Sequence, residues 1–387
     1  MAGSDLGDGF STKQITKSIK VTKTQVNNFK AELSKPTIPL TVFGDIKTLN
    51  ITEKMLYWYP WIDNIKHKNV YLSLNLRWGP NGEYPSPPPP GYDYYISHGD
   101  SLMFGWPEHV INNVDGKIIH LTGALILDSF DTDRIQYVPH NTAHKRIRGV
   151  AITDIDKDIQ FKTSALTNRV TQSKAIIFSA LMHVLGEKNC VASLHHDLHN
   201  TKNIHSWKPS GNSTCDYYLN LFREQWLDKS LLLPHDDQVT WSCNNSAYRT
   251  AALNFTQESY HYSYMMKDGR SYVEPGPFVT EKTWKCLKSA TAFIPVGQVH
   301  VYHWFKQLGL QFDYGELDLS FDNDAGNLTR LEKIVNLIKS LTQWTAQDLY
   351  QMTYESTQHN FEHVQSQRFW DICEESNTAT YKLLNNL

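Results

Sequence analysis

The chain lacks several features that would place it in a specialised class of protein. Its five cysteines are spread over 387 residues and never form a CxxC pair, so we expect neither a disulfide framework nor a zinc ribbon. No apolar run approaches the thickness of a bilayer. The polar N-terminus has neither the apolar core of a signal peptide nor the Arg-rich pattern of a transit peptide. These absences predict a cytoplasmic protein that does not enter a membrane.

Strong charge of one sign and the common phosphate-binding loops are also missing. The 37 basic and 40 acidic residues give a net charge of −3, so a nucleic-acid partner would need a local basic patch. Neither GxxxxGK[ST] nor GxGxxG occurs, which argues against a nucleotide hydrolase or a kinase. What the chain does have is an apolar share of 40%, which is enough to fill the cores of two ordinary domains.

Apolar strand patterns alternate with helical patterns along most of the chain. The strand patterns cover residues 38–43, 70–76, 94–98, 117–122, 159–164, 191–194, 251–255 and 292–296. A helical spacing of apolar residues covers 172–185, and Gly186 follows as a C-cap. Alternation of this kind is typical of parallel sheets with crossover helices. We therefore predict an α/β protein with two doubly wound halves that face each other across a cleft.

The same patterns divide the chain into four parts. Residues 1–37 are polar and predict an N-terminal arm. Residues 38–155 are predicted to form a first α/β domain, and residues 156–345 a second. From residue 346 to 387 the apolar spacing is helical, and we expect these helices to pack back on the first domain.

One junction between a strand and a helix carries residues suited to a nucleotide. A strand pattern ends at Glu258 and Ser259, a polar loop follows, and Thr280 then has the residue type of a helix N-cap in front of Glu281 and Lys282. The free N–H groups of a helix N-terminus suit a diphosphate, and Lys282 adds a positive charge. A carboxylate such as Glu281 or Glu258 can accept the hydroxyls of a ribose. Taken alone, however, the segment is explained by an ordinary capped helix with a solvated lysine.

The surrounding sequence resembles bacteriophage-type glycosyltransferases, which are distantly similar to the fucosyltransferases. The resemblance extends over residues 245–365 and rests on the segments FVTEKTWK and AFIPVG, on residues 304–310, and on Asp322 and Arg330. The fucosyltransferase pattern ENS … TEK binds a nucleotide-sugar. Its matching residues in this chain are Glu258, Ser259, Thr280, Glu281 and Lys282.

The resemblance implies the GT-B fold, in which two Rossmann-like domains face each other across a cleft and a helical C-terminal tail follows. The second domain would bind a UDP- or GDP-sugar as co-substrate. No metal or other cofactor is implied, because lysine, arginine and helix-end dipoles stabilise the leaving diphosphate in such enzymes. A fainter similarity over residues 162–185 adds Arg169 as a ligand of the donor phosphates, although a surface salt bridge explains Arg169 equally well. Lys285-Cys286 and residues 298–300 depart from the family pattern and leave the choice of donor open.

The sequence says less about the acceptor molecule and about the residues that would bind it. The likeness to phage proteins implies transfer to an acceptor hydroxyl such as that of a hydroxymethylated pyrimidine in phage DNA, in the cytoplasm of the host cell. A basic patch of Lys145, Arg146 and Arg148 could contact DNA or the donor phosphates, although a solvated loop is the commoner explanation. Asp100 and then His98 are candidates for the general base, because both follow position 97, near which a strand pattern of the first domain ends. The alternative is a non-catalytic nucleotide- or DNA-binding module that keeps a glycosyltransferase fold.

Overall fold

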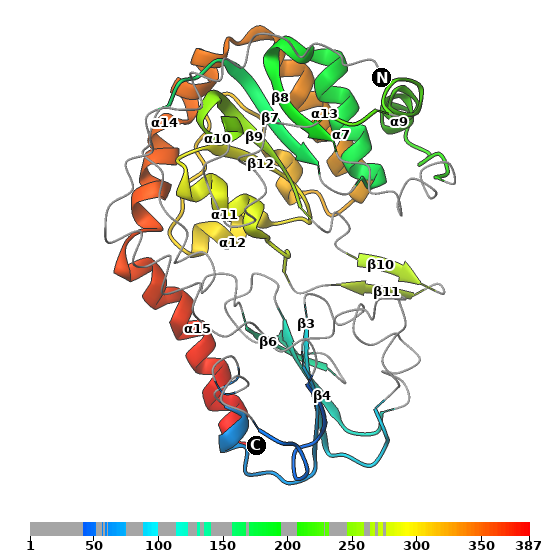
Figure 1. The fold of residues 1–387 in the computed structure, drawn as a ribbon, viewed down its shortest axis with the longest axis vertical. Helices are drawn as coiled ribbons and strands as arrows, with labels where there is room; N and C mark the ends of the chain where they lie inside the picture. The colour runs from blue at the N-terminus through cyan, green and yellow to red at the C-terminus, as the bar shows by residue number, and fades with distance from the viewer. Residues whose placement is uncertain are drawn as a thin grey trace.

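Two separate sheets of mainly parallel strands organise the molecule (Figure 1). The computed structural model describes residues 42–51, 56, 59, 61–74, 88–99, 114–122, 130–131, 135–140, 157–167, 170–194, 207–227, 229–231, 246–258, 264–267, 270–273 and 276–387. Helices connect the parallel strands and continue to the C-terminus. The α/β class predicted from the sequence is therefore confirmed.

The N-terminal sheet contains six strands. These are β1 (Val42–Asp45), β2 (Val70–Leu74), β3 (Tyr94–Gly99), β4 (Lys117–Thr122), β5 (Phe130–Asp131) and β6 (Ile135–Pro139), and a 3-10 turn, η1 (Ile62–Asn64), precedes β2. Their order in the sheet is β1-β2-β3-β4-β6-β5. The four central strands run parallel. The edge strands β1 and β5 are antiparallel to their neighbours, whereas the sequence patterns predicted parallel sheets. The sequence shows no strand pattern for β5, because a strand of two residues is too short to show a period.

The C-terminal sheet contains four strands in a fully parallel arrangement. They are β7 (Phe161–Thr167), β8 (Cys190–Leu194), β9 (Ala251–Gln257) and β12 (Ala292–Val296). Their order is β12-β9-β7-β8. Every residue of β8, β9 and β12 is buried, as is typical of parallel strands that are covered on both faces. The sequence patterns located all four strands, with small shifts at their ends.

Different helices cover the two faces of this sheet. The helices of this part of the chain are α7 (Gln172–Val184), α9 (Ser213–Gln225), α10 (Ser246–Thr250), α11 (Glu281–Lys288), α12 (Val301–Gln307) and α13 (Asn327–Ser340). Cys190 Sγ donates to Leu181 O of α7 at 3.7 Å and accepts from Thr163 Oγ1 at 3.2 Å, so the face of β7 that carries Thr163 is turned toward α7. On the other face, Thr256 Oγ1 of β9 lies 3.7 Å from Cys286 Sγ of α11.

A small hairpin lies between β9 and α11. β10 (Tyr264–Lys267) pairs antiparallel with β11 (Arg270–Val273), where the sequence analysis predicted a polar loop. That prediction was wrong because two strands of four residues give almost no periodic signal. The Asp-Gly dipeptide at residues 268–269 is the hairpin signal that the prediction should have used.

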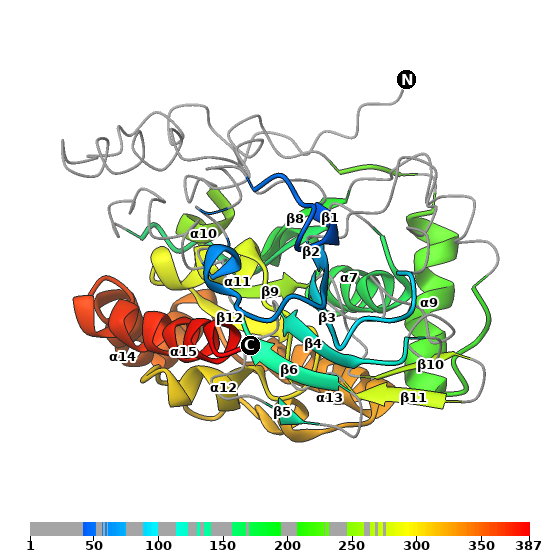
Figure 2. The same ribbon diagram turned by 90° about the horizontal axis from the view of Figure 1, so that it is seen from below.

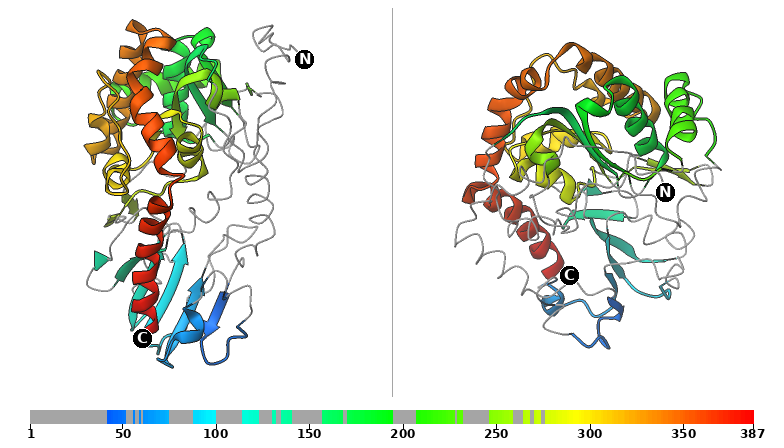
Figure 3. Two further views of the ribbon diagram at one scale, coloured as in Figure 1. Left: turned by 90° about the vertical axis from the view of Figure 1, so that its left-hand side faces the viewer. Right: turned by 45° about the horizontal axis from the view of Figure 1, so that its top comes forward.

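The last two helices connect the two sheets. They are α14 (Ala346–His363) and α15 (Gln367–Asn385), and Figure 2 shows both on the side of the molecule opposite α9. Near the start of α15, Phe369 packs against Trp284 of α11, with ring centroids 6.0 Å apart. Near its end, Thr380 Oγ1 donates to Pro139 O of β6 at 2.7 Å, and Leu384 is buried in the core of the N-terminal sheet. Figure 3 shows α15 running alongside both parts of the chain.

A second contact between the two parts comes from Trp304 of α12. It packs against the C-terminal core and also against a cluster on the N-terminal sheet that contains Tyr95 and Tyr137. Among the helices in the described ranges, none has the length and apolar composition needed to cross a membrane.

Candidate functional site

The strand order of the C-terminal sheet creates a switch point between β7 and β9. From β7 the chain continues to β8 on one side, and it then returns to β9 and β12 on the other side. Ligands of open α/β sheets bind outside the carboxyl ends of the strands at such a point. The last residues of the two strands here are Thr167 and Gln257, and Glu258 connects this edge to the start of α11.

Glu258 fixes the N-terminus of α11 through three hydrogen bonds. One carboxylate oxygen accepts from the backbone N–H of Thr280 at 3.1 Å and also from the Thr280 hydroxyl. The other oxygen accepts from Thr283 Oγ1 at 2.6 Å. Glu258 is only 2% exposed, and hydrogen bonds to an ionised acceptor are stronger than neutral ones. Both oxygens of Glu258, which the sequence analysis considered as a ligand of a ribose, are thus engaged at the start of α11.

Thr280 is the N-cap of α11, as its residue type predicted. Its side chain accepts a hydrogen bond from the backbone N–H of Lys282. The ammonium of Lys282 donates to the same hydroxyl at 3.0 Å, and this side chain is half-buried. The Lys282 charge therefore lies at the N-terminal end of the helix, where the helix dipole is also positive. Both groups are of a kind that suits a diphosphate, and the buried carboxylate of Glu258 at the same helix end offsets part of their positive charge.

The loop after β12 is held by Asp322, one of the residues on which the family resemblance rests. Its two carboxylate oxygens accept from the backbone N–H groups of Val301 at 2.8 Å and Tyr302 at 2.9 Å, at the start of α12. Burial raises the pKa of Asp322 to about 6, although these amides and Arg330 act in the opposite direction. His300, which precedes α12, has a φ of 67°. That is the left-handed region of backbone conformation, which favours glycine.

Arg330 completes this support of the edge of the sheet. It is 1% exposed, and its guanidinium donates to Gly297 O at 3.2 Å, to Asp324 O at 2.7 Å and to Asn327 Oδ1 at 2.9 Å. Gly297 directly follows β12. Arg330 therefore joins α13 to the carboxyl end of the neighbouring strand, and its donors are directed at protein carbonyls.

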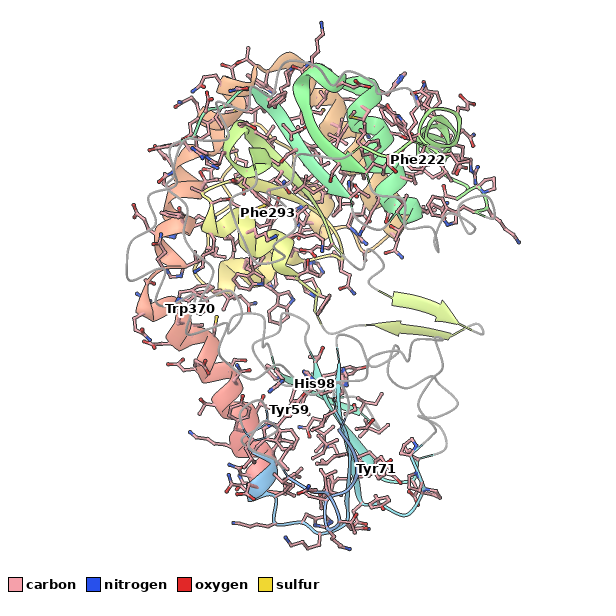
Figure 4. All side chains as sticks on the ribbon, in the orientation of Figure 1. Tyr59, Tyr71, His98, Phe222, Phe293 and Trp370 are labelled. Carbon is pink, nitrogen blue, oxygen red and sulfur yellow. The ribbon has the colours of Figure 1, made fainter. Side chains whose placement is uncertain are left out.

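His98 is the described member of the two candidates for the general base. It is 6% exposed, and its Nδ1 lies 3.0 Å from the hydroxyl of Tyr59. Its ring packs edge-on against His140, with ring centroids 4.8 Å apart. Figure 4 shows His98 and Tyr59 at the end of the N-terminal sheet that is nearer to the C-terminal sheet, with Tyr71 toward the far end. His98 therefore lies at the end of its sheet that faces the C-terminal sheet.

His120 on the neighbouring strand β4 is also buried at this end of the sheet. Its Nδ1 lies 2.8 Å from Ser97 Oγ. Burial, assisted by the nearby His98, lowers the pKa of His120 to about 3. Its imidazole is therefore neutral at physiological pH.

Several residues predicted for the site lie outside the described residues. They are Asp100, Lys145, Arg146, Arg148, Arg169 and Ser259. For Glu281 the structure describes the backbone, in the first turn of α11, and not the side chain. The structure therefore brings together Glu258, Thr280 and Lys282 from the predicted set.

Thr283 is a residue of this site that the sequence analysis missed. Its hydroxyl binds Glu258, and its distance of three positions from Thr280 places both hydroxyls on one side of the first helical turn. Gln298 was noted only as a departure from the family pattern, yet its Oε1 accepts from the backbone N–H of Phe278 at 2.7 Å. It thus ties the segment before α11 to the loop after β12.

Within the portion of the chain that the structure describes, no group of three or more acidic, histidine or cysteine side chains is arranged to hold a metal ion. Comparisons with protein-family models, with curated proteins and with solved structures find no match to this chain.

Proposed function

We propose that this protein is a glycosyltransferase that moves a sugar from a nucleoside-diphosphate donor to an acceptor hydroxyl, on a GT-B-like arrangement of its two sheets. The observation that carries the proposal is the start of α11. Buried Glu258 holds this helix end at the carboxyl edge of a parallel sheet, and the Lys282 charge lies beside it. Such an edge is where α/β proteins bind nucleotides.

In the proposed reaction the acceptor oxygen forms a bond to the anomeric carbon of the donor sugar as the bond to the diphosphate breaks. The helix end of α11 and Lys282 stabilise the negative charge that develops on the leaving diphosphate. The Glu281 side chain is proposed to bind the ribose, and Arg169 the phosphates. If the reaction inverts the anomeric centre, the acceptor proton passes to a base on the N-terminal sheet, for which His98 and Asp100 are the candidates.

Calorimetric titration with UDP, GDP and their sugar conjugates tests the donor site. We expect Lys282→Ala to weaken donor binding by roughly ten- to a hundredfold, because a hydrogen bond to a charged group is worth about 1.5–3 kcal/mol. Lys285→Ala is the matched control, since Lys285 is a half-buried lysine in the last turn of the same helix. Unchanged affinity in Lys282→Ala, or equal losses in the two variants, would refute the donor site.

The proposed acceptor is a hydroxymethylated pyrimidine in DNA. Incubation of the protein with a bound donor and with DNA that contains 5-hydroxymethyl pyrimidines should add the mass of one sugar to those bases, as measured by mass spectrometry of the nucleosides. Unmodified DNA is the control. Donor binding without any transfer to either DNA, and without release of nucleoside diphosphate, would favour a non-catalytic binding module.

A further inference from the structure

Three buried polar atoms at the switch point have no hydrogen-bond partner in the part of the chain that the structure describes. They are the hydroxyl of Thr167 and both atoms of the Gln257 carboxamide, and among the described residues none of the three makes a hydrogen bond. Thr167 is 0% and Gln257 1% exposed. Buried polar groups of native proteins are almost always hydrogen-bonded. Three such atoms without partners among the described residues therefore point to a ligand as the source of their hydrogen bonds.

The two residues are the final positions of neighbouring strands. The paired register of β7 and β9 runs from Phe161–Ala251 to Ser164–Asn254, and the same offset aligns Thr167 with Gln257. Both lie at the carboxyl ends that flank the switch point. This is the place in the sheet where a ligand is expected.

Side-chain alternation puts both residues on the face covered by α7. Thr167 lies four positions after Thr163, whose neighbour Cys190 contacts α7, so the two threonines share that face. Thr256 is turned toward α11, so Gln257, the next residue, is turned to the opposite face. The unpartnered atoms thus lie on the α7 face of the sheet at the end of β9, and the start of α11 lies on the opposite face.

The chemistry of these atoms selects a neutral ligand group. A carboxamide supplies both a carbonyl acceptor and N–H donors, and a hydroxyl both donates and accepts. A diphosphate has only acceptors and would leave the Gln257 carbonyl unsatisfied. Neutral groups that both donate and accept hydrogen bonds would satisfy the Gln257 carboxamide and the Thr167 hydroxyl. A nucleotide-sugar contains two kinds of such group, the hydroxyls of its sugar and the lactam edge of its base.

We propose that Thr167 and Gln257 form a subsite for a neutral hydrogen-bonding part of the donor. This inference rests on the proposed function, because it takes the diphosphate to lie at α11. The donor then straddles the end of β9, with its charged part against Lys282 and the α11 N-terminus and its neutral part against Thr167 and Gln257 on the α7 side.

Two apolar substitutions of similar shape test the subsite, Thr167→Val and Gln257→Met. Each should weaken donor binding by roughly five- to tenfold in calorimetric titration, because each removes one or two neutral hydrogen bonds to the ligand. Neither should lower the Tm of the ligand-free protein, because neither breaks a bond within it. Ser179→Ala is the control. Its hydroxyl is also buried without a partner, but it lies in the middle of α7, so the affinity should not change.

The titrations use UDP, GDP and their sugar conjugates as ligands. A loss of affinity confined to the sugar conjugates assigns the subsite to the sugar, whereas a loss that includes the free diphosphates assigns it to the base, and either result supports the proposal. Wild-type affinity in both variants, while Lys282→Ala binds the donor more weakly, would overturn the subsite and leave the donor site standing. Absence of binding by the wild-type protein would overturn both. A Tm lowered in both variants would show that the groups have partners in the free protein, which also overturns the subsite.

Discussion

The strongest test of the site geometry is the removal of the Glu258 carboxylate. Glu258→Ala would leave three donors without their acceptor: the backbone N–H of Thr280, the Thr280 hydroxyl and the Thr283 hydroxyl. Hydrogen bonds to charged groups contribute about 1.5–3 kcal/mol each, and an unsatisfied buried donor costs about 1–3 kcal/mol. Because the three bonds share one side chain, their losses are not additive. We expect the free energy of unfolding to fall by about 3–5 kcal/mol.

A loss of this size is a large part of the ordinary stability of a domain, about 5–15 kcal/mol. At about 2–4 °C per kcal/mol for a domain of this size, the Tm should fall by roughly 10 °C. Denaturation by guanidinium chloride, followed by circular dichroism, measures the change. Glu258→Gln keeps one acceptor and should lose only about 1–2 kcal/mol.

Thr283 provides the internal check on this explanation. Thr283→Val removes one hydroxyl that Glu258 accepts from, while Thr283→Ser keeps it and serves as the control. The double variant Glu258→Ala/Thr283→Val should lose less than the sum of the two single losses, since Thr283 has nothing left to bind once Glu258 is gone. Strictly additive losses, or a wild-type denaturation midpoint for Glu258→Ala, would refute the role of Glu258 in holding α11.

Two further predictions concern the supporting structure. The pKa of Asp322 is raised from 3.8 to about 6, so its contribution to stability is fully present below about pH 4 and is lost as the pH rises through about 6. Relative to Asp322→Asn, the wild-type protein should lose roughly 1–3 kcal/mol between pH 4 and pH 7 in denaturation titrations, and a constant difference would contradict the shift. Gly309→Ala should destabilise more than Gly186→Ala, because both glycines have positive φ but only at Gly309 would the new Cβ lie 2.6 Å from His363 Nε2. Equal losses in Tm would show that His363 moves aside without cost.

Local features of the fold could be predicted from the sequence because they depend on residues close together in the chain. The apolar runs of β8, β9 and β12 and the helical spacing of α7 follow from side-chain periodicity. Thr280 could be recognised as an N-cap because capping needs only its own hydroxyl and the next turn of backbone.

Features that depend on distant residues could not be predicted in this way. Glu258 meets Thr280 and Thr283 only because β9 and α11 are adjacent in space. The placement of Arg330 against Gly297, and of Thr380 against Pro139 in the other sheet, requires the complete packing of α13 and α15. Such pairs leave no periodic trace in the sequence, since each partner is a single polar residue.

The sequence by itself therefore determined the α/β class, most of the strands and the capped helix that begins at Thr280. Only the tertiary structure decided that Glu258 binds the start of this helix, and that Thr167 and Gln257 end side by side without partners among the described residues. The physical reason is the distance along the chain over which each kind of interaction acts. Periodicity and capping are set within one or two turns of chain, whereas the satisfaction of a buried polar group depends on whichever strands and helices the whole fold brings to its side.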